Sequence, residues 1–261
     1  MRRLAEIAPG VLAATSECYR TITTVVIDRD RDHGRCLVID PAVTVREVTA
    51  LAAELAAAGL SPQAGFATHP HWDHVLWCRD LGEVPRYAAA SAVAVAIAER
   101  DKMISGVQAT APGHDLELFG QLTALAPDQE AIPLDGPQAR VVTHDGHASG
   151  HSAVFLPDTG TLIAGDMLSD VEIPLLDLAG PDPLGDYRAG LERLAALPGV
   201  RHIVPGHGSV GDAAGFRRRV AADFAYLDRL ARGDDSDDPR LALDWLREQH
   251  RLHLALVQAR Q

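Results

Sequence analysis

The chain has 261 residues, of which 47% are hydrophobic and 23% are charged. These proportions are ordinary for a globular protein, and they exclude collagen-like, disordered and disulfide-scaffold classes. The length allows one large domain or two small ones. The formal net charge is −12. Because an acidic surface repels a phosphate backbone, we expect no nucleic-acid partner.

The sequence predicts a cytoplasmic protein with no membrane partner. No stretch approaches the roughly 20 apolar residues that a membrane helix requires. An acidic residue, a proline and a glycine fall within the first ten positions and interrupt the apolar core of a signal peptide. The three cysteines, Cys18, Cys36 and Cys78, form no C-x-x-C pair. We therefore expect them to be reduced and largely buried.

The first half of the chain predicts short strands and two helices. The expected elements are strands over residues 21–28, 35–40 and 64–68, a hairpin connection over 29–34, and helices over 45–58 and 88–100. The first helix has the clearest pattern, because apolar residues from Val48 to Leu55 recur at helical spacing and Gly59 ends it. Residues 103–135 are punctuated by glycine and proline, and we assign no element there.

The second half predicts four more strands and three helices. These are strands over residues 139–143, 153–156, 161–164 and 200–204, and helices over 187–197, 215–232 and 240–257. A turn at 157–160 joins two of the strands, and the acidic segment 233–239 is a hinge between the last two helices. Strands that mix hairpins with helical crossovers favour a layered α/β fold with helices outside.

One short segment is rich in metal-binding side chains. Three histidines and an aspartate, His69, His71, Asp73 and His74, fall within six positions. The residues at 69, 71 and 73 share one parity, so an extended backbone presents them on one side, and a turn must aim His74. Imidazole nitrogens and carboxylate oxygens suit zinc, iron or manganese better than calcium or magnesium. Isolated surface histidines need no such clustering, so this segment predicts a transition-metal site.

Further candidate ligands follow predicted strands elsewhere in the chain. His144 and His147 follow one strand, Asp166 ends another, and His207 ends a third. Strand ends gather along one edge of a sheet, where loops form sites. We expect these side chains to meet the cluster around His69.

Taken together, these segments resemble the metallo-β-lactamase superfamily, whose signature is H-x-H-x-D-H followed by a single His, a single Asp and a last His. The resemblance covers roughly residues 10–215. It implies a four-layer αββα sandwich, in which helices flank two mixed β-sheets and a two-metal site lies at one edge. We expect a catalytic domain over residues 1–215 and a C-terminal helical extension over 216–261 packed on it.

The resemblance also implies the metal ligands. They are His69, His71 and His147 for the first metal, Asp73, His74 and His207 for the second, and Asp166 as the carboxylate that bridges them. The cofactors would be two divalent ions, with zinc favoured and iron or manganese as alternatives.

The histidine of the third motif has neighbours that compete for its role. His151 resembles the structural partner of the ligand His147 and would act by hydrogen bonding behind it. His144 is an alternative ligand, but it comes too early relative to the Gly-His step. Asp145 and Ala148 depart from the more common proline and threonine of the family, and neither departure removes a ligand.

The complete ligand set favours hydrolysis. Two divalent metals can share a bridging water, lower its pKa toward ~7 and supply hydroxide for attack on a carbonyl. Asp73 is also placed to receive or return a proton. The expected substrate is a small-molecule ester, thioester, lactone or amide. The first alternative is an iron-dependent oxidoreductase resembling persulfide dioxygenases, which lack several second-site ligands, and the second is a protein that holds metal without turnover.

Single residues narrow the substrate only a little. Ser169 stands where acyl-homoserine lactonases usually carry a tyrosine, and Lys102 is the only lysine, so no lysine clamp for a β-lactam is evident. Residues 217–219 are three arginines that could grip glutathione, as basic residues do in glyoxalase II, or could simply face solvent. His71 excludes the flavin-linked diiron members, which carry glutamate there.

Three features remain open from the sequence. Residues 103–135 could form a lid over the metals or cap the sheet. Trp72 and Trp77 could form a substrate wall or belong to the core. The amphipathic helix after Arg240 could complete the domain or form a homodimer contact.

Overall fold

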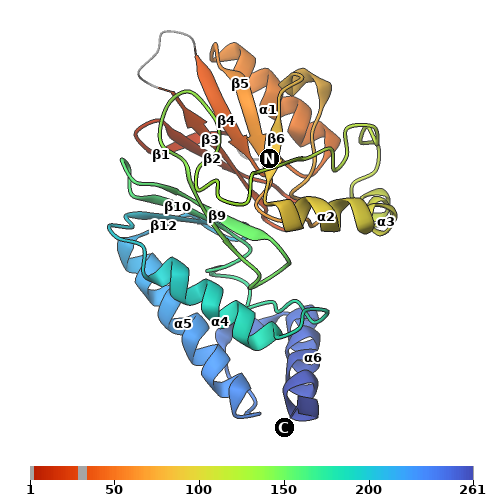
Figure 1. The fold of residues 1–261 in the computed structure, drawn as a ribbon, viewed down its shortest axis with the longest axis vertical. Coiled ribbons are helices and arrows are strands. Elements are labelled where there is room, and N and C mark those ends of the chain that lie inside the picture. The colour runs from red at the N-terminus through yellow and green to blue at the C-terminus, as the bar shows by residue number, and fades with distance from the viewer. Residues whose placement is uncertain (1–2, 29–33, 261) are drawn as a thin grey trace.

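The computed structural model describes residues 3–28 and 34–260, so the hairpin connection expected at 29–34 lies almost entirely outside the described residues. Within the described part of the chain, the strands form two sheets that face each other (Figure 1). The first sheet follows chain order: β1 (Ala5–Ala8), β2 (Val11–Thr15), β3 (Ile22–Ile27), β4 (Arg35–Ile39), β5 (Ser61–Phe66), β6 (Arg86–Ala88) and β7 (Thr123–Ala124). Its strands are antiparallel from β1 to β4 and parallel from β4 to β7.

The second sheet has the order β12-β11-β10-β9-β8. Its strands are β8 (Arg140–His144), β9 (His151–Leu156), β10 (Thr161–Gly165), β11 (His202–Pro205) and β12 (Gly211–Asp212). Strands β10 and β11 are parallel, and the remaining pairs are antiparallel. Both sheets are therefore mixed.

Helices cover the outer sides of the two sheets (Figure 1). In the first half they are α1 (Val45–Ala57), α2 (Ala90–Ala98) and α3 (Arg100–Thr110), and in the second half α4 (Pro183–Ala195), α5 (Ala213–Ala231) and α6 (Asp244–Arg260). Short 3-10 turns occupy Arg79–Leu81 and Pro239–Ala242. The expected four-layer αββα arrangement of mixed sheets and flanking helices is confirmed.

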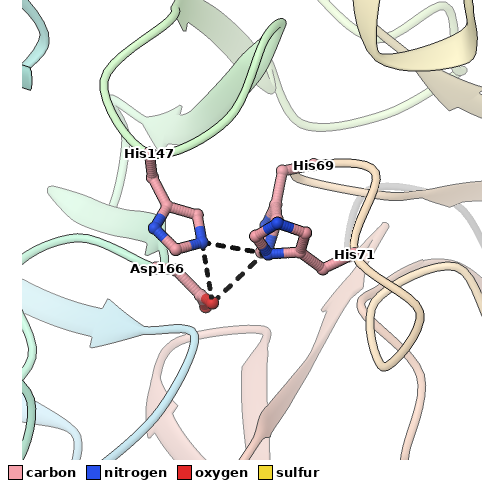
Figure 2. Close-up of side chains that lie close together, drawn as sticks. All are labelled: His69, His71, His147 and Asp166. Carbon is pink, nitrogen blue, oxygen red and sulfur yellow. Dashed lines mark hydrogen bonds and ion pairs between the residues drawn. The ribbon is translucent and has the colours of Figure 1, made fainter. Parts of the chain in front are cut away.

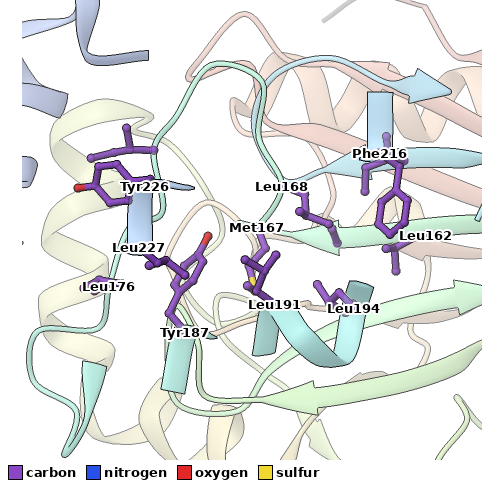
Figure 3. Packing of buried hydrophobic residues seen from close by; sticks show 14 of the residues in the cluster. Leu162, Met167, Leu168, Leu176, Tyr187, Leu191, Leu194, Phe216, Tyr226 and Leu227 are labelled. Carbon is purple, nitrogen blue, oxygen red and sulfur yellow. The ribbon is translucent and has the colours of Figure 1, made fainter. Parts of the chain in front are cut away.

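Strands β9 and β10 are buried on both faces, which explains the apolar runs over residues 153–156 and 162–164. Phe155 and Leu162 pack toward α4 and α5, and the alternate residues Val154 and Ile163 pack between the two sheets. Figure 3 shows Leu162 beside residues of these helices. Each fully buried side chain of this size contributes about 1.5–3 kcal/mol, so these two strands anchor the second sheet in the middle of the sandwich.

Two backbone hydrogen bonds join the sheets at one edge. Ile22 N, at the start of β3, donates to Gly206 O after β11 at 2.7 Å, and Ser152 N of β9 donates to Thr68 O after β5 at 2.7 Å. These bonds fix the loops that follow β5 and β11 against each other across the sandwich.

Several elements differ from the prediction. The hairpin of β1 and β2 was not expected, because its four- and five-residue strands are mostly Ala, Leu and Glu rather than β-branched residues. Strand β5 begins three residues earlier than expected, at Ser61. The helix expected over 88–100 stops at Ala98, and α3 then runs to Thr110 through a segment to which no element had been assigned.

The cysteines are all unpaired. Cys36 is buried, whereas Cys18 and Cys78 are half-buried. Among the described residues, no helix combines the length and the apolar character needed to span a bilayer.

Candidate metal centre

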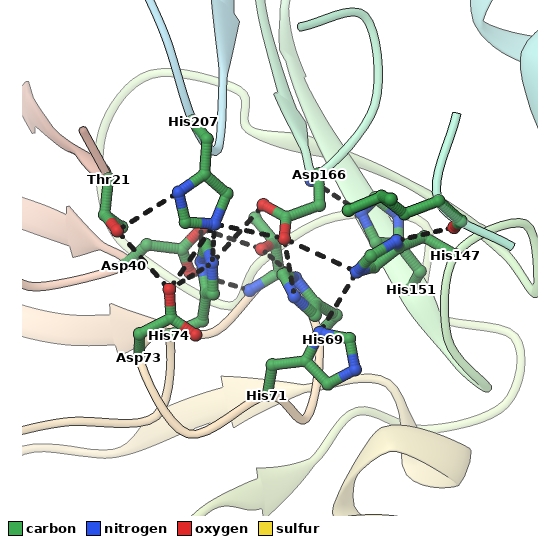
Figure 4. Close-up of polar contacts among 12 residues, drawn as sticks. Thr21, Asp40, His69, His71, Asp73, His74, His147, His151, Asp166 and His207 are labelled. Carbon is green, nitrogen blue, oxygen red and sulfur yellow. Dashed lines mark hydrogen bonds and ion pairs between the residues drawn. The ribbon is translucent and has the colours of Figure 1, made fainter. Parts of the chain in front are cut away.

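All seven predicted ligands lie together at the edge where the two sheets are joined (Figure 4). The loop after β5 carries His69, His71, Asp73 and His74, and the β8–β9 loop carries His147. Asp166 directly follows β10 and His207 follows β11. Each half of the sandwich therefore supplies part of one cluster.

The first set, here called the His69 group, comprises His69, His71, His147 and Asp166, each of which offers one ligand atom within 4.8 Å of the others. The Nε2 atoms of His69 and His147 both lie 3.4 Å from Asp166 Oδ2. His71 Nδ1 lies 3.0 Å from His147 Nε2. Figure 2 shows these side chains converging on one point.

The second set, the Asp73 group, comprises Asp73, His74 and His207 and meets the same distance criterion of 4.8 Å. Asp73 Oδ2 lies 3.4 Å from His207 Nε2 and 3.5 Å from His74 Nε2. Asp166 reaches this group too, because its Oδ1 lies 3.3 Å from His74 Nε2 and its Oδ2 lies 3.2 Å from His207 Nε2. One carboxylate therefore contacts both sets.

In three of the candidate ligand histidines, Nδ1 has a partner outside the cluster and Nε2 is directed at the cluster. His147 Nδ1 donates to Leu175 O at 2.8 Å, and His207 Nδ1 donates to Tyr19 O at 3.0 Å. His74 Nδ1 lies 3.0 Å from Asp40 Oδ2. A partner on one ring nitrogen orients the ring so that its other nitrogen can bind a metal.

The cluster fits cations on two further observations. His69 Nε2 and Asp166 Oδ1 are buried and make no hydrogen bond within the described part of the chain, and such orphaned atoms are costly unless something pairs with them. Burial alone would lower the pKa of His74, but the carboxylates of Asp166, Asp73 and Asp40 raise it to about 9. The carboxylates around His74 therefore favour a positive charge at the cluster.

His151 and His144 lie behind the cluster rather than in it. His151 Nε2 accepts a hydrogen bond from Asp166 N at 3.0 Å, and its Nδ1 lies 3.3 Å from His144 Nε2. Burial lowers the pKa of His144 to about 4 and that of His151 well below its usual value, so both rings are neutral at pH 7. The structure thus brings His147, and not His144, to the ligand positions.

A glycine makes room for the shared carboxylate. A Cβ atom at Gly206 would lie 1.9 Å from Asp166 Oδ1, so no larger residue fits there without moving that oxygen. The absence of a side chain beside His207 therefore leaves the space that the Asp166 carboxylate occupies.

Sequence reasoning missed three supporting residues. Asp40 follows β4 and accepts hydrogen bonds from Thr68 N at 2.9 Å and Thr68 Oγ1 at 2.7 Å, in addition to its contact with His74. Thr21 Oγ1 donates to Asp73 Oδ2 at 3.3 Å. Burial and the nearby Asp166 raise the pKa of Glu172 to about 7 against the opposing effect of His207. In the sequence, Asp40-Pro41 indicated only the end of a strand, and neither Thr21 nor Glu172 belongs to a recognisable motif.

The other residues singled out from the sequence have mixed locations. Arg219 donates to Leu168 O and Ser209 O, while Arg217 and Arg218 are exposed on α5. Trp77 is buried, and its Nε1 donates to Gly82 O. Trp72 is half-buried and lines a cavity beside the cluster.

Comparison with known proteins agrees with this geometry. Residues 20–207 match the family model of the metallo-beta-lactamase superfamily, which is more than half of the chain. The chain therefore belongs to this superfamily of metallo-hydrolases.

Particular relatives are similar at a modest level. The hydroxyacylglutathione hydrolase of Ruegeria pomeroyi is 28% identical over 198 residues, which are 76% of this chain and 67% of that protein. The enzyme of the same name from Rhodobacter capsulatus is 32% identical over 140 residues, 54% of this chain and 46% of that protein. This chain thus spans only about half to two thirds of these curated relatives.

A solved structure is similar over most of both chains. It is the metallo-beta-lactamase family protein TTHA1429 from Thermus thermophilus, with a TM-score of 0.65, 25% sequence identity, and coverage of 87% of this chain and 83% of that chain.

Proposed function

We propose that the protein is a dinuclear metal-dependent hydrolase that cleaves a small-molecule ester, thioester, lactone or amide. The observation that carries this proposal is the Asp166 carboxylate, which contacts the imidazoles of both ligand groups. A carboxylate in that position suits two cations a few ångströms apart.

His69, His71 and His147 would hold one ion, Asp73, His74 and His207 the other, and Asp166 would bridge them. Two divalent ions supply Lewis acidity and a water whose pKa is lowered toward ~7. Zinc is favoured, with iron or manganese as alternatives, because the donors are nitrogen and oxygen atoms without thiolate. The names of the curated relatives favour a thioester among the substrates.

Asp73 is the proposed proton carrier. Its Oδ2 accepts a hydrogen bond from Thr21 Oγ1 at 3.3 Å and faces the rings of His74 and His207. A carboxylate held in this way can take a proton from the attacking water and return it to the departing alkoxide, thiolate or amine. Thr21 holds the carboxylate in place during both transfers.

The test is hydrolysis after reconstitution with zinc, manganese or iron. We expect about two ions per chain by metal analysis and activity on at least one of an ester, thioester, lactone or β-lactam panel. His71→Ala and Asp166→Ala should each reduce turnover by about a hundredfold or more with an unchanged circular dichroism spectrum, while exposed Arg218→Ala should leave it intact. Undiminished turnover in both site variants would exclude the proposed site.

The runner-up function is iron-dependent oxidation of a thiol or persulfide. The complete Asp73 group argues against it, since a single iron needs fewer ligands. Oxygen uptake with thiol substrates at one iron per chain would replace the hydrolase proposal. We also propose a small-molecule substrate with neither a nucleic-acid nor a membrane partner, and the homodimer remains a prediction to be tested by sedimentation.

A further inference from the structure

A cavity of about 590 Å³ opens beside the ligand His71. Its walls come from the loop after β5, from α2 and α3, from the residues after His147, and from residues 177–179. A substrate whose carbonyl lies at the cluster would place a neighbouring group in this cavity.

The lining of the cavity is mostly apolar. Trp72, Val95, Ala98 and Met103 supply much of the wall. Helix α3 approaches the indole of Trp72 closely at Gly106, where a Cβ atom would lie only 3.2 Å from Cδ1 of Trp72. The indole forms one side of the cavity, and apolar surface buried against it contributes to binding.

The few charges that line the cavity are predominantly acidic. They are Glu99, Lys102 and Asp177, which carry a net charge of −1. Lys102 Nζ pairs with Glu99 Oε2 at 2.8 Å and also interacts electrostatically with Asp177, so two carboxylates share the one lysine of the lining. A substrate carboxylate therefore meets repulsion there.

We propose that this cavity binds an uncharged, apolar group of the substrate and that the enzyme acts on neutral esters or thioesters in preference to thioesters of a thiol bearing carboxylates. This inference rests on the proposed hydrolase function and narrows its substrate class. This preference would distinguish the protein from its relatives named hydroxyacylglutathione hydrolase, because glutathione carries two carboxylates.

The experiment uses two homologous series on the metal-loaded enzyme. One lengthens the acyl chain on neutral N-acetylcysteamine, and the other lengthens a neutral alkyl thiol on an acetyl group. In at least one series, kcat/KM should rise about two- to fourfold per methylene until the cavity is filled. The same acyl group on glutathione should be about tenfold worse or more.

Two variants test whether this cavity is responsible. Ala98→Trp fills the opening from an exposed position on α2 and should remove the dependence on chain length while short acetyl esters are still cleaved. Ala94→Trp is the matched control, because Ala94 is also exposed on α2 but does not line the cavity. Flat dependence in both series, an unaffected Ala98→Trp, or a preference for glutathione would overturn the inference, whereas no hydrolysis of any substrate would overturn the proposed function instead.

A second inference concerns the loop from Met167 to Leu178, which lies between the cluster and the C-terminal helices. On the cluster side, Ser169 Oγ donates to His207 O at 2.9 Å, and Leu175 O accepts from His147 Nδ1 at 2.8 Å. One contact therefore reaches a ligand of each group.

Arg240 holds this loop from the other side. Its side chain is 7% exposed, and its Nη1 donates to Ser169 O at 3.2 Å and to Glu172 O at 3.0 Å. The same nitrogen donates to Asp223 Oδ1 on α5 at 2.5 Å, and Nη2 donates to Asp238 Oδ2 at 2.8 Å. The two carboxylates fix the guanidinium so that it can hold the two loop carbonyls.

A directed chain of hydrogen bonds holds the far end of the loop. Leu176 N donates to His253 Nε2 at 3.3 Å, so His253 Nδ1 carries the proton and donates to Tyr226 Oη at 3.0 Å. Tyr226 Oη in turn donates to His250 Nδ1 at 2.9 Å, and His250 Nε2 donates to Asp235 Oδ1 at 3.0 Å. Each ring nitrogen of His250 and His253 therefore has a hydrogen-bond partner.

We infer that Arg240 and His253 are positioning residues through which the C-terminal helices orient His147 and His207. Partners behind a metal ligand typically change metal affinity by about 10- to 100-fold when removed. A role in folding alone would lower the melting temperature and leave the affinity of the folded protein unchanged.

The test measures zinc affinity by chelator competition at a temperature where every variant is folded by circular dichroism. His253→Leu and Arg240→Met should each weaken zinc binding about tenfold or more. His253→Gln, whose Oε1 can still accept from Leu176 N, should bind zinc with nearly the affinity of the parent protein. Arg251→Met, at an exposed position on α6, should leave the zinc affinity unchanged. If His253→Leu and Arg240→Met lower the melting temperature but bind zinc like the parent protein, the positioning role is wrong.

Discussion

At the scale of single residues, the two histidines that compete for one ligand position have opposite surroundings. His147 has one nitrogen on a backbone carbonyl and the other toward Asp166 Oδ2, whereas His144 faces His151. The difference follows from the loop after β8, which returns toward the cluster only at residues 146–147. The predicted strand alone could not show which of the two histidines is the ligand.

This contrast gives a prediction for a pair of variants. His147→Ala should lose about one of two metal ions per chain, because it removes a ligand from the His69 group. His144→Ala should keep both ions and lose only stability, by about 1–3 kcal/mol for a buried polar contact. Metal analysis with urea unfolding measures both effects. Loss of metal from His144→Ala with retention in His147→Ala would reverse the assignment.

At the scale of elements, the sequence predicts strands well where burial is two-sided. Strands β9 and β10 have continuous apolar runs because each contacts both the other sheet and the helices. The H-x-H-x-D-H segment predicted a cluster by its composition, but the extended backbone expected there was wrong, because residues 68–71 form bends and 72–74 a turn. The β1–β2 hairpin was missed because its short strands are mostly Ala, Leu and Glu. The supporting Asp40 was missed because a lone aspartate before proline indicates only the end of a strand. What joins the motifs is long-range packing, and no local pattern encodes it.

Helix α6 should make stability depend on pH through His253. Burial lowers the pKa of this ring to about 4, against about 6.5 in an unfolded chain. The unfolded state therefore binds the proton more tightly, and stability that is complete above pH 6.5 is lost as the pH falls toward 4. Between pH 7 and pH 5 the loss is about 2 kcal/mol.

The variant His253→Gln isolates this effect, because it keeps an acceptor for Leu176 N and cannot titrate. Urea unfolding at both pH values should show the parent protein losing about 2 kcal/mol more than His253→Gln. Ligand histidines titrate in both proteins and cancel in the comparison. Equal losses in the two proteins would mean that His253 is not held neutral by the fold.

At the scale of the whole molecule, the cluster connects the two halves of the sandwich. The first sheet's loop supplies His69, His71, Asp73 and His74, and the second sheet supplies His147, Asp166 and His207. Asp166 of the second sheet lies 3.4 Å from His69 Nε2 of the first half, and His71 Nδ1 lies 3.0 Å from His147 Nε2 across the same junction. Bound ions would therefore stabilise the packing of one sheet on the other, in addition to serving catalysis.

Removal of the metals should consequently lower the stability of the entire chain. A ligand present at a hundred times its dissociation constant stabilises a fold by about 2.7 kcal/mol, which corresponds to roughly 5–10 °C in melting temperature for a domain of this size. Differential scanning calorimetry of the chelated and reconstituted protein measures the shift, and Asp166→Ala should show a smaller one because it has lost the residue common to both groups. Identical melting of chelated and metal-loaded protein, with metal content verified in each, would show that the ions do not bind at the junction of the sheets.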